Sequence, residues 1–193
     1  HLSIRRQRQM CIRDSYRRVW LDENLLAVVS SYLGLVPHLA EAYVRRNYPS
    51  PFRTMNHYWH RDLNGRHYLL KIFVFLSDCT VENGPHEFIR GSHKRFDLLN
   101  GKRYFTDQEV DAAYPPHGPD RDVGMVKAGT VIIEDTRGLH RAQMPNVGFR
   151  DLGYAVFVPF TEGSQTANYK FPRAGWESLT DFQRAFIPRG CLS

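Results

Sequence analysis

Cysteine is scarce in this sequence, since its 193 residues include only Cys11, Cys79 and Cys191. The three form neither a Cys-x-x-Cys pair nor an even-numbered set, which excludes a disulfide framework. Proteins of this kind are typical of a reducing compartment. We therefore expect an intracellular, cytoplasmic protein.

Long apolar runs are also absent, and no stretch approaches the roughly 20 residues that a membrane-spanning helix needs. The first residues lack the charged-then-apolar pattern of a secretory signal. The sequence has no Gly-rich phosphate loop, no Gly-x-Ser-x-Gly nucleophile turn and no Cys–His pair that points to thiol catalysis. These absences argue against a membrane partner and against several common enzyme classes.

Acidic residues number 20 against 26 basic ones, so the formal net charge is +6. Residues 1–15 contain four arginines and one aspartate, a net of +3, and the rest of the chain therefore carries only +3. A nucleic-acid partner would need one contiguous Lys/Arg face on that remaining part. We expect no nucleic-acid partner.

The first residues also look foreign. The segment from Arg5 to Ser15 resembles the in-frame translation of a sequencing-library adapter, as found in a metagenomic gene fragment. We expect residues 1–15 to be a non-native scar, and residues 16–193 to form a single domain that has lost its N-terminal part. The alternative is a genuine disordered basic arm.

Three helices are predicted by the spacing of apolar residues and by capping signals. They cover residues 22–34, 37–44 and 106–114. The third begins at Thr106, and Glu109 three residues later completes a capping box.

Five strands are predicted, over residues 54–62, 69–76, 86–89, 130–135 and 152–160. The first alternates with a period of two, and the others are dense in apolar residues or bounded by turns. Strands of this length, joined by irregular loops and preceded by helices, predict a mainly β fold with flanking helices. The pattern is typical of a two-sheet sandwich of the jelly-roll kind.

A His-x-Asp pair, His60 and Asp62, lies near the end of the first strand, and His140 follows a later one. Residues two apart on a strand point to the same face. Two imidazoles and one carboxylate are the ligand set of a mononuclear non-haem iron(II) that keeps open positions. His-x-Asp alone is weak, because the chain has nine histidines and a surface His beside a solvated Asp is the common case. The distal His140 strengthens the prediction of a metal site.

Two cations accompany these residues. Arg150 lies where the last strand begins, and its planar fork matches the far carboxylate of an α-keto diacid. The alternative is a surface ion pair with Asp151 or with a carboxylate elsewhere. Lys71 lies within an apolar strand, where a charge is costly unless paired. Lys71 either reaches the carboxylate of a co-substrate or substrate, or occupies an edge or solvent-facing position.

Five segments, in this order, carry a more specific signal: Tyr58–Asp62, Leu70–Asp78, Glu82–Pro85, Gly91–Lys94 and Asp135–Arg141. Together they resemble the phytanoyl-CoA dioxygenase family over roughly residues 56–160. The resemblance implies a double-stranded β-helix (jelly roll, cupin-like) with iron(II), 2-oxoglutarate and O₂. It places His60, Asp62 and His140 on the iron and Arg150 on the distal carboxylate of 2-oxoglutarate.

The resemblance implies an enzyme that hydroxylates a small organic molecule and releases succinate and CO₂. Asp62 leaves no coordination position for a halide, which favours hydroxylation over halogenation. Two alternatives stay open: a cupin-like metal-binding protein or isomerase without redox chemistry, in which Arg150 need not face the metal, and an inactive truncated dioxygenase. The chain departs from the family in Arg90, which stands where a proline is usual, and in its short N-terminal part.

Overall fold

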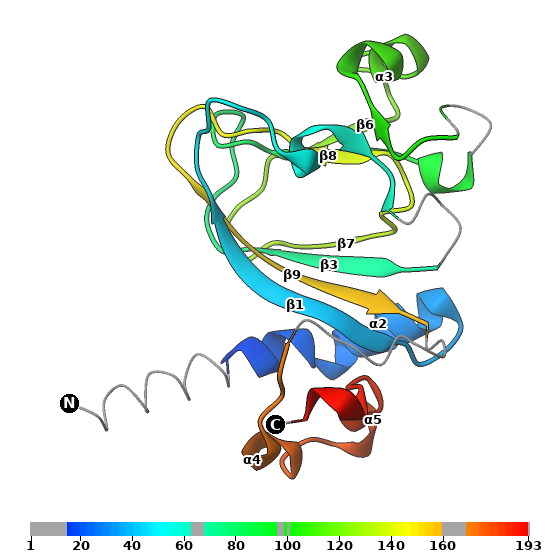
Figure 1. Ribbon diagram of the computed structural model, residues 1–193, viewed down its shortest axis with the longest axis vertical. Coiled ribbons are helices and arrows are strands. Elements are labelled where there is room, and N and C mark those ends of the chain that lie inside the picture. Colours follow the sequence, from blue (N-terminus) through cyan, green and yellow to red (C-terminus); the bar gives the residue numbers. More distant parts are fainter. Residues whose placement is uncertain (1–14, 63–67, 96–98, 100, 160–168, 193) are drawn as a thin grey trace. The chain divides into compact units, whose positions relative to one another are not determined.

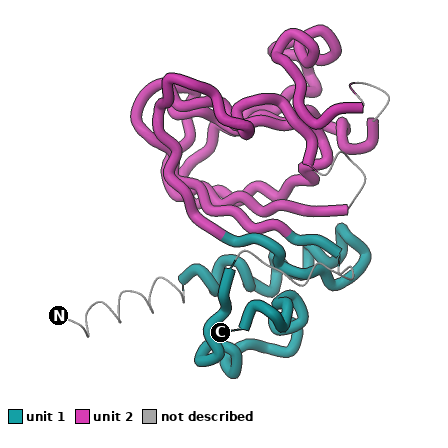
Figure 2. The backbone as a smooth tube through the Cα atoms, in the orientation of Figure 1, with its two compact units in different colours: residues 1–42, 157–193 teal, residues 43–156 magenta. Residues whose placement is uncertain are grey.

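The structure is a computed structural model that describes residues 15–62, 68–95, 99, 101–159 and 169–192. The predicted scar over residues 1–15 lies almost wholly outside the described residues. The chain divides into two compact units, residues 1–42 with 157–193 (unit 1) and residues 43–156 (unit 2), shown in Figure 2. The prediction of a single domain stays a prediction.

Unit 1 contains the first predicted helix, and its boundaries are confirmed. Helix α2 spans Glu23–Leu33. The carboxylate of Asp22 accepts hydrogen bonds from two backbone N–H groups of the first turn, and Gly34 ends the helix in a left-handed conformation with φ of 71°. The other helices of unit 1 are α4 (Arg173–Trp176), α5 (Asp181–Ala185) and the 3₁₀ helix η4 (Arg189–Cys191). No described helix is long and apolar enough to cross a membrane.

The predicted helix over residues 37–44 is wrong. This segment belongs to strand β1, which spans His38–Asn47 and pairs with β9. Short apolar segments satisfy helix and strand patterns almost equally well, so the partner that is available in the folded chain decides between them. Here a sheet edge is the partner.

A four-stranded sheet contains β1 and has the strand order β1-β9-β3-β7 (Figure 1). In it, β3 spans Leu70–Phe75, β7 spans Val131–Glu134 and β9 spans Arg150–Val158. Strands β3 and β7 are antiparallel, with Lys71 opposite Glu134. The strands predicted over residues 69–76, 130–135 and 152–160 are confirmed within two residues at each end.

A second sheet, within unit 2, has the order β5-β2-β8-β4-β6. Its strands are β2 (Trp59–His60), β4 (His86–Ile89), β5 (Tyr104–Phe105), β6 (Arg121–Gly124) and β8 (His140–Ala142). The two sheets face each other, because the Phe73 ring of β3 lies 5.0 Å from the His86 ring of β4. This antiparallel double sheet is the predicted jelly roll (Figure 1).

Only the end of the strand predicted over residues 54–62 forms. Residues Met55–His57 make a 3₁₀ helix, η1, and β2 begins at Trp59. His57 donates its backbone N–H to the Thr54 carbonyl at 2.9 Å, and its Nδ1 accepts from the Thr54 N–H at 3.1 Å. Local bonds of this kind compete with strand pairing.

The polar helix is confirmed as α3, Asp107–Ala113, with the predicted capping box between Thr106 and Glu109. It covers the face of the second sheet that points away from the first sheet, over an apolar cluster. The cluster contains Trp59, Ile89, Phe105, Val110, Tyr114 and Leu139. A further 3₁₀ helix, η3, spans Ser92–Lys94.

Candidate metal centre

Three predicted metal ligands, His60, Asp62 and His140, meet at one end of the second sheet. His60 of β2 and His140 of β8 are direct partners in the antiparallel ladder. Asp62 follows β2 by two residues, and its N–H donates to the Thr136 carbonyl at 2.9 Å. One side-chain ligand atom from each of the three lies within 4.8 Å of the others, and all three residues are buried.

Each imidazole is held by the carbonyl two residues before it. His60 Nδ1 lies 2.9 Å from the Tyr58 carbonyl oxygen, and His140 Nδ1 lies 3.0 Å from that of Gly138. A carbonyl oxygen only accepts, so each Nδ1 must carry the hydrogen and each Nε2 keeps a free lone pair. This arrangement sets the tautomer and the ring orientation that a metal site needs.

The electrostatics also suit a cation. Burial lowers the pKa of both His60 and His140, so the two imidazoles are neutral at pH 7. Burial disfavours the charged form of Asp62, yet the adjacent charge of Lys71 helps to hold the pKa of its carboxyl below the usual range. The site therefore offers two neutral nitrogen donors and one carboxylate.

Lys71 reaches this carboxylate, with its Nζ 2.6 Å from Asp62 Oδ2. Its strand, β3, lies between β9 and β7, and only 18% of the side chain is exposed. The edge or solvent-facing alternative for Lys71 is therefore wrong. The residue is a cation within the site, and its role toward a co-substrate stays a prediction.

Arg150, the first residue of β9, is 1% exposed. Its Nε, Nη1 and Nη2 are all buried and have no hydrogen-bond partner among the described residues. Burial lowers the pKa of this guanidinium to about 10, so it remains charged at pH 7. The predicted alternative of a surface pair with Asp151 is wrong, because Asp151 pairs with Arg46 through two bonds of 2.6 Å.

A cavity joins Arg150 to the metal ligands. Its walls include His60, His140, Lys71 and Arg150. The other lining residues are Arg45, Asn56, Phe73, His86, Ala142, Leu152 and Tyr154. All predicted site residues except Asp62 therefore line one cavity. Asp62 contacts Lys71, which is one of the lining residues.

Arg61, between two of the predicted ligands, is a buried brace that the sequence analysis missed. Its Nη1 donates to the carbonyls of Ser92 at 2.7 Å and Arg137 at 2.8 Å, and its Nη2 to that of Arg95 at 3.2 Å. These bonds tie the segment of His60 and Asp62 to the loop before His140. A sequence pattern does not reveal that one side chain binds backbone carbonyls from two distant segments.

Gly138 permits the close packing that precedes His140. A Cβ at this position would lie 2.6 Å from Phe88 Cε2 and 2.9 Å from Ser92 Oγ. The buried Ser92 hydroxyl donates to the Ile89 carbonyl at 2.6 Å and accepts from the Leu139 N–H at 2.7 Å. Ser92 thus fixes the loop that carries His140.

Trp59 is supported on the side of the sheet opposite His60. The guanidinium carbons of Arg121 and Arg141 lie 4.9 and 4.7 Å from the Trp59 ring centre. Both arginines pair with the buried Glu87, Arg121 at 2.8 Å and Arg141 at 2.8 Å. This ion cluster holds the strand that presents His60.

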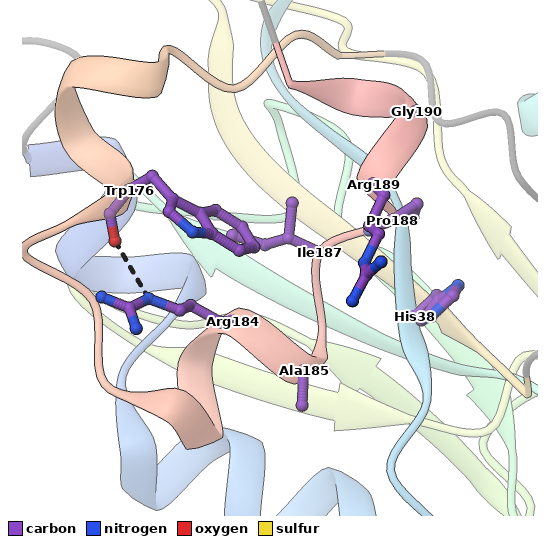
Figure 3. A pocket seen from close by; sticks show the side chains of 8 residues that line it. All are labelled: His38, Trp176, Arg184, Ala185, Ile187, Pro188, Arg189 and Gly190. Carbon is purple, nitrogen blue, oxygen red and sulfur yellow. Dashed lines mark hydrogen bonds between the residues drawn. The ribbon is translucent and has the colours of Figure 1, made fainter.

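Unit 1 has a cavity of its own, of about 570 Å³. Figure 3 shows its lining residues, His38, Trp176, Arg184, Ala185, Ile187, Pro188, Arg189 and Gly190. Arg184 Nε donates to the Trp176 carbonyl at 3.2 Å, and no carboxylate of the described residues lines this space. It therefore lacks the mixed donor set of the centre in unit 2.

The sequence matches the family model "Phytanoyl-CoA dioxygenase (PhyH)" over residues 5–146. The match includes the three candidate metal ligands and ends before Arg150. A search of curated proteins finds no match.

Solved structures share the fold. The non-haem alpha-ketoglutarate-dependent carbocyclase SnoK from nogalamycin biosynthesis is 22% identical, with a TM-score of 0.55 over 74% of this chain and 58% of that chain. HygX from Streptomyces hygroscopicus with nickel and 2-oxoglutarate is 22% identical, with a TM-score of 0.54 over 75% and 64%. The epimerase SnoN in complex with Fe³⁺, alpha-ketoglutarate and nogalamycin RO is 21% identical, with a TM-score of 0.55 over 76% and 59%. The chain thus spans about three fifths of the length of these proteins.

Proposed function

Because the chain belongs to the phytanoyl-CoA dioxygenase family, we propose that it is an iron(II)- and 2-oxoglutarate-dependent oxygenase that hydroxylates a small organic molecule. The observation that carries the proposal is the pairing of a His-Asp-His cluster with a buried guanidinium in one cavity. A metal site alone would suit many proteins. The additional unpartnered cation fits an acidic co-substrate.

The donor set fits iron(II). His60 and His140 would each offer Nε2, since each Nδ1 is engaged by a backbone carbonyl. Asp62 would offer a carboxylate oxygen that now faces Lys71. Two histidines and one carboxylate on one side of a metal leave positions for other ligands, which is typical of non-haem iron oxygenases.

The co-substrate also fits. Arg150 is a buried charged group with three unused donor atoms that lines the cavity, and a carboxylate is the group that its planar fork binds best. Lys71 lies at the metal end of the cavity and would contact the co-substrate there. The two cations line one cavity of about 60 Å³, and both could contact the carboxylates of a small diacid.

When bound, iron(II) and 2-oxoglutarate would supply oxygen activation, with succinate and CO₂ as co-products. The protein's part is to bind, orient and exclude water. The hydrogen bonds of Tyr58 and Gly138 orient the two imidazoles. The aromatic side chains of Phe73 and Tyr154 line the cavity and would help to exclude water from it.

The cupin-like alternative without redox chemistry does not account for Arg150. An isomerase or metal store needs the three ligands but no guanidinium with free donors beside them. Within oxygenases the reaction type is a separate question, since two structures of this fold are named a carbocyclase and an epimerase. Product analysis would separate hydroxylation from these outcomes.

The test is succinate formation from 2-oxoglutarate, with iron(II) and O₂ and no added substrate. We expect iron-dependent succinate in the unaltered protein, none in His60→Ala and strongly reduced formation in Arg150→Ala. His117→Asn is the matched control, because His117 lies outside the cavity and asparagine tolerates its φ of 62°. Equal succinate formation in His60→Ala and the control would contradict the proposal.

A further inference from the structure

Arg45 is a second arginine in the cavity of the candidate metal centre. It lies on β1 and lines the same space as Arg150, His60 and His140. Its guanidinium carbon lies 5.8 Å from the ring centre of Tyr154. Burial lowers its pKa, and its Nε is buried without a partner among the described residues.

The contacts of Arg45 leave its charge uncompensated. With the Asn56 amide oxygen turned toward it, Asn56 accepts from Arg45 Nη1 at 2.7 Å and from Nη2 at 3.3 Å. This partner is neutral. No ion pair joins Arg45 to a carboxylate in the part of the chain that the structure describes.

The charges around the cavity are therefore out of balance. Lys71 faces Asp62 at 2.6 Å, but neither Arg45 nor Arg150 faces a carboxylate among the described residues. Glu134 does not line the cavity, and its Oε2 lies 2.6 Å from His86 Nε2. The two guanidiniums also feel each other, because Arg45 adds to the effect of burial in lowering the pKa of Arg150.

Arg150 is buried and Arg45 is partly buried, and two like charges without counter-ions in such a place are costly in a folded protein. Natural proteins keep such arrangements where a ligand supplies the opposite charge. A carboxylate has two oxygens and accepts from two guanidiniums at once. Bringing one carboxylate between Arg45 and Arg150 would offset both charges.

We propose that Arg45 binds the distal carboxylate of 2-oxoglutarate together with Arg150, so that two arginines select a dicarboxylic co-substrate. This inference rests on the proposed function. It adds a binding residue from β1, which precedes the metal ligands in the sequence. It also implies that a 2-oxo acid without the second carboxylate binds poorly.

The test is calorimetric binding to the full chain, loaded with iron(II) in the absence of O₂. The two ligands are 2-oxoglutarate and 2-oxopentanoate, which has a methyl group in place of the distal carboxylate. For Arg45→Met we expect 2-oxoglutarate to bind about 10- to 100-fold more weakly, because its charge-assisted hydrogen bonds to Arg45 are lost. Binding of 2-oxopentanoate should change little, and Arg45→Lys should be intermediate.

Arg46→Met is the matched control. Arg46 is the next residue on β1 but points to the opposite face, where it pairs with Asp151. Its replacement should leave the preference for 2-oxoglutarate over 2-oxopentanoate unchanged. Arg150→Met should reduce that preference, as Arg45→Met does. Thermal unfolding of each variant shows whether it is folded.

The outcomes are distinct. Unaltered protein that fails to bind 2-oxoglutarate overturns the proposed function and this inference with it. If the unaltered protein binds it and Arg45→Met binds it equally well, only this inference fails. Equal weakening of both ligands in Arg45→Met and Arg45→Lys also overturns it, because Arg45 would then act on the shape of the site rather than on the distal carboxylate.

Discussion

His60 and His140 face each other across one rung of an antiparallel ladder, with their ring centres 4.1 Å apart. Each ring is held by a carbonyl two residues earlier in its own strand or turn. The two imidazoles are thus placed by backbone register rather than by flexible loops. A metal bound here should be held by a preformed site.

Removal of one ligand should abolish stabilisation by metal. A ligand that binds only the folded state stabilises it by about 2.7 kcal/mol at 100 times its dissociation constant. We expect iron(II) or nickel(II) to raise the melting temperature of the unaltered protein and not that of His140→Ala. Differential scanning calorimetry with and without metal measures this. His117→Asn should respond as the unaltered protein does, and a full metal response in His140→Ala would contradict the assignment.

Arg61→Ala should destabilise the protein and weaken metal binding together. The change removes three bonds from a buried guanidinium to backbone carbonyls, and we expect a loss of about 3 kcal/mol or more in the free energy of unfolding. Urea unfolding and a metal titration measure the two effects. The control is Arg90→Ala, at an exposed position paired only at the surface. If Arg61→Ala is as stable as the unaltered protein but binds metal more weakly, Arg61 positions the metal ligands without stabilising the fold.

Gly138→Ala should force the loop before His140 to move. The new methyl group would overlap the Phe88 ring, with 2.6 Å between the Cβ and Cε2, and overpacking of this kind costs about 1–3 kcal/mol. Phe88→Leu should relieve part of the overlap. A double-mutant cycle of unfolding free energies tests this. Strict additivity of the two changes would contradict the predicted contact.

Acid should weaken the ion cluster beneath Trp59. Burial alone would raise the pKa of Glu87, but hydrogen bonds from Gln143 and the charges and bonds of Arg141 and Arg121 lower it below its usual 4.5. The unfolded state therefore binds more protons in this range, and the stabilisation is present above pH 4.5 and is lost as the pH falls below it.

The variant Glu87→Gln tests this pH dependence. It should be less stable than the unaltered protein at pH 7, because Arg121 and Arg141 each lose the buried one of their two carboxylate partners. The difference in unfolding free energy should shrink as the pH falls from 5 toward 3. The exposed substitution Glu82→Gln is the control. A difference that stays constant over this range would contradict the role of the carboxylate.

Local sequence patterns were enough for much of the fold. The caps at Asp22 and Thr106 marked two helices, because a side chain at that position meets the free N–H groups of the first turn. Alternating and dense apolar runs marked the buried strands. His60, Asp62 and His140 were found by the same logic, and the fold brings them together.

Other features depend on which segments meet in the folded chain. Residues 37–44 read as a helix and form a strand, because β9 offers an edge to pair with. Arg61 and Glu87 bind partners on distant strands and loops. Arg45 lines the cavity from β1, and the sequence pattern of that segment does not predict this position. Charge compensation and packing are properties of three-dimensional neighbours, so a linear chain of residues does not reveal them.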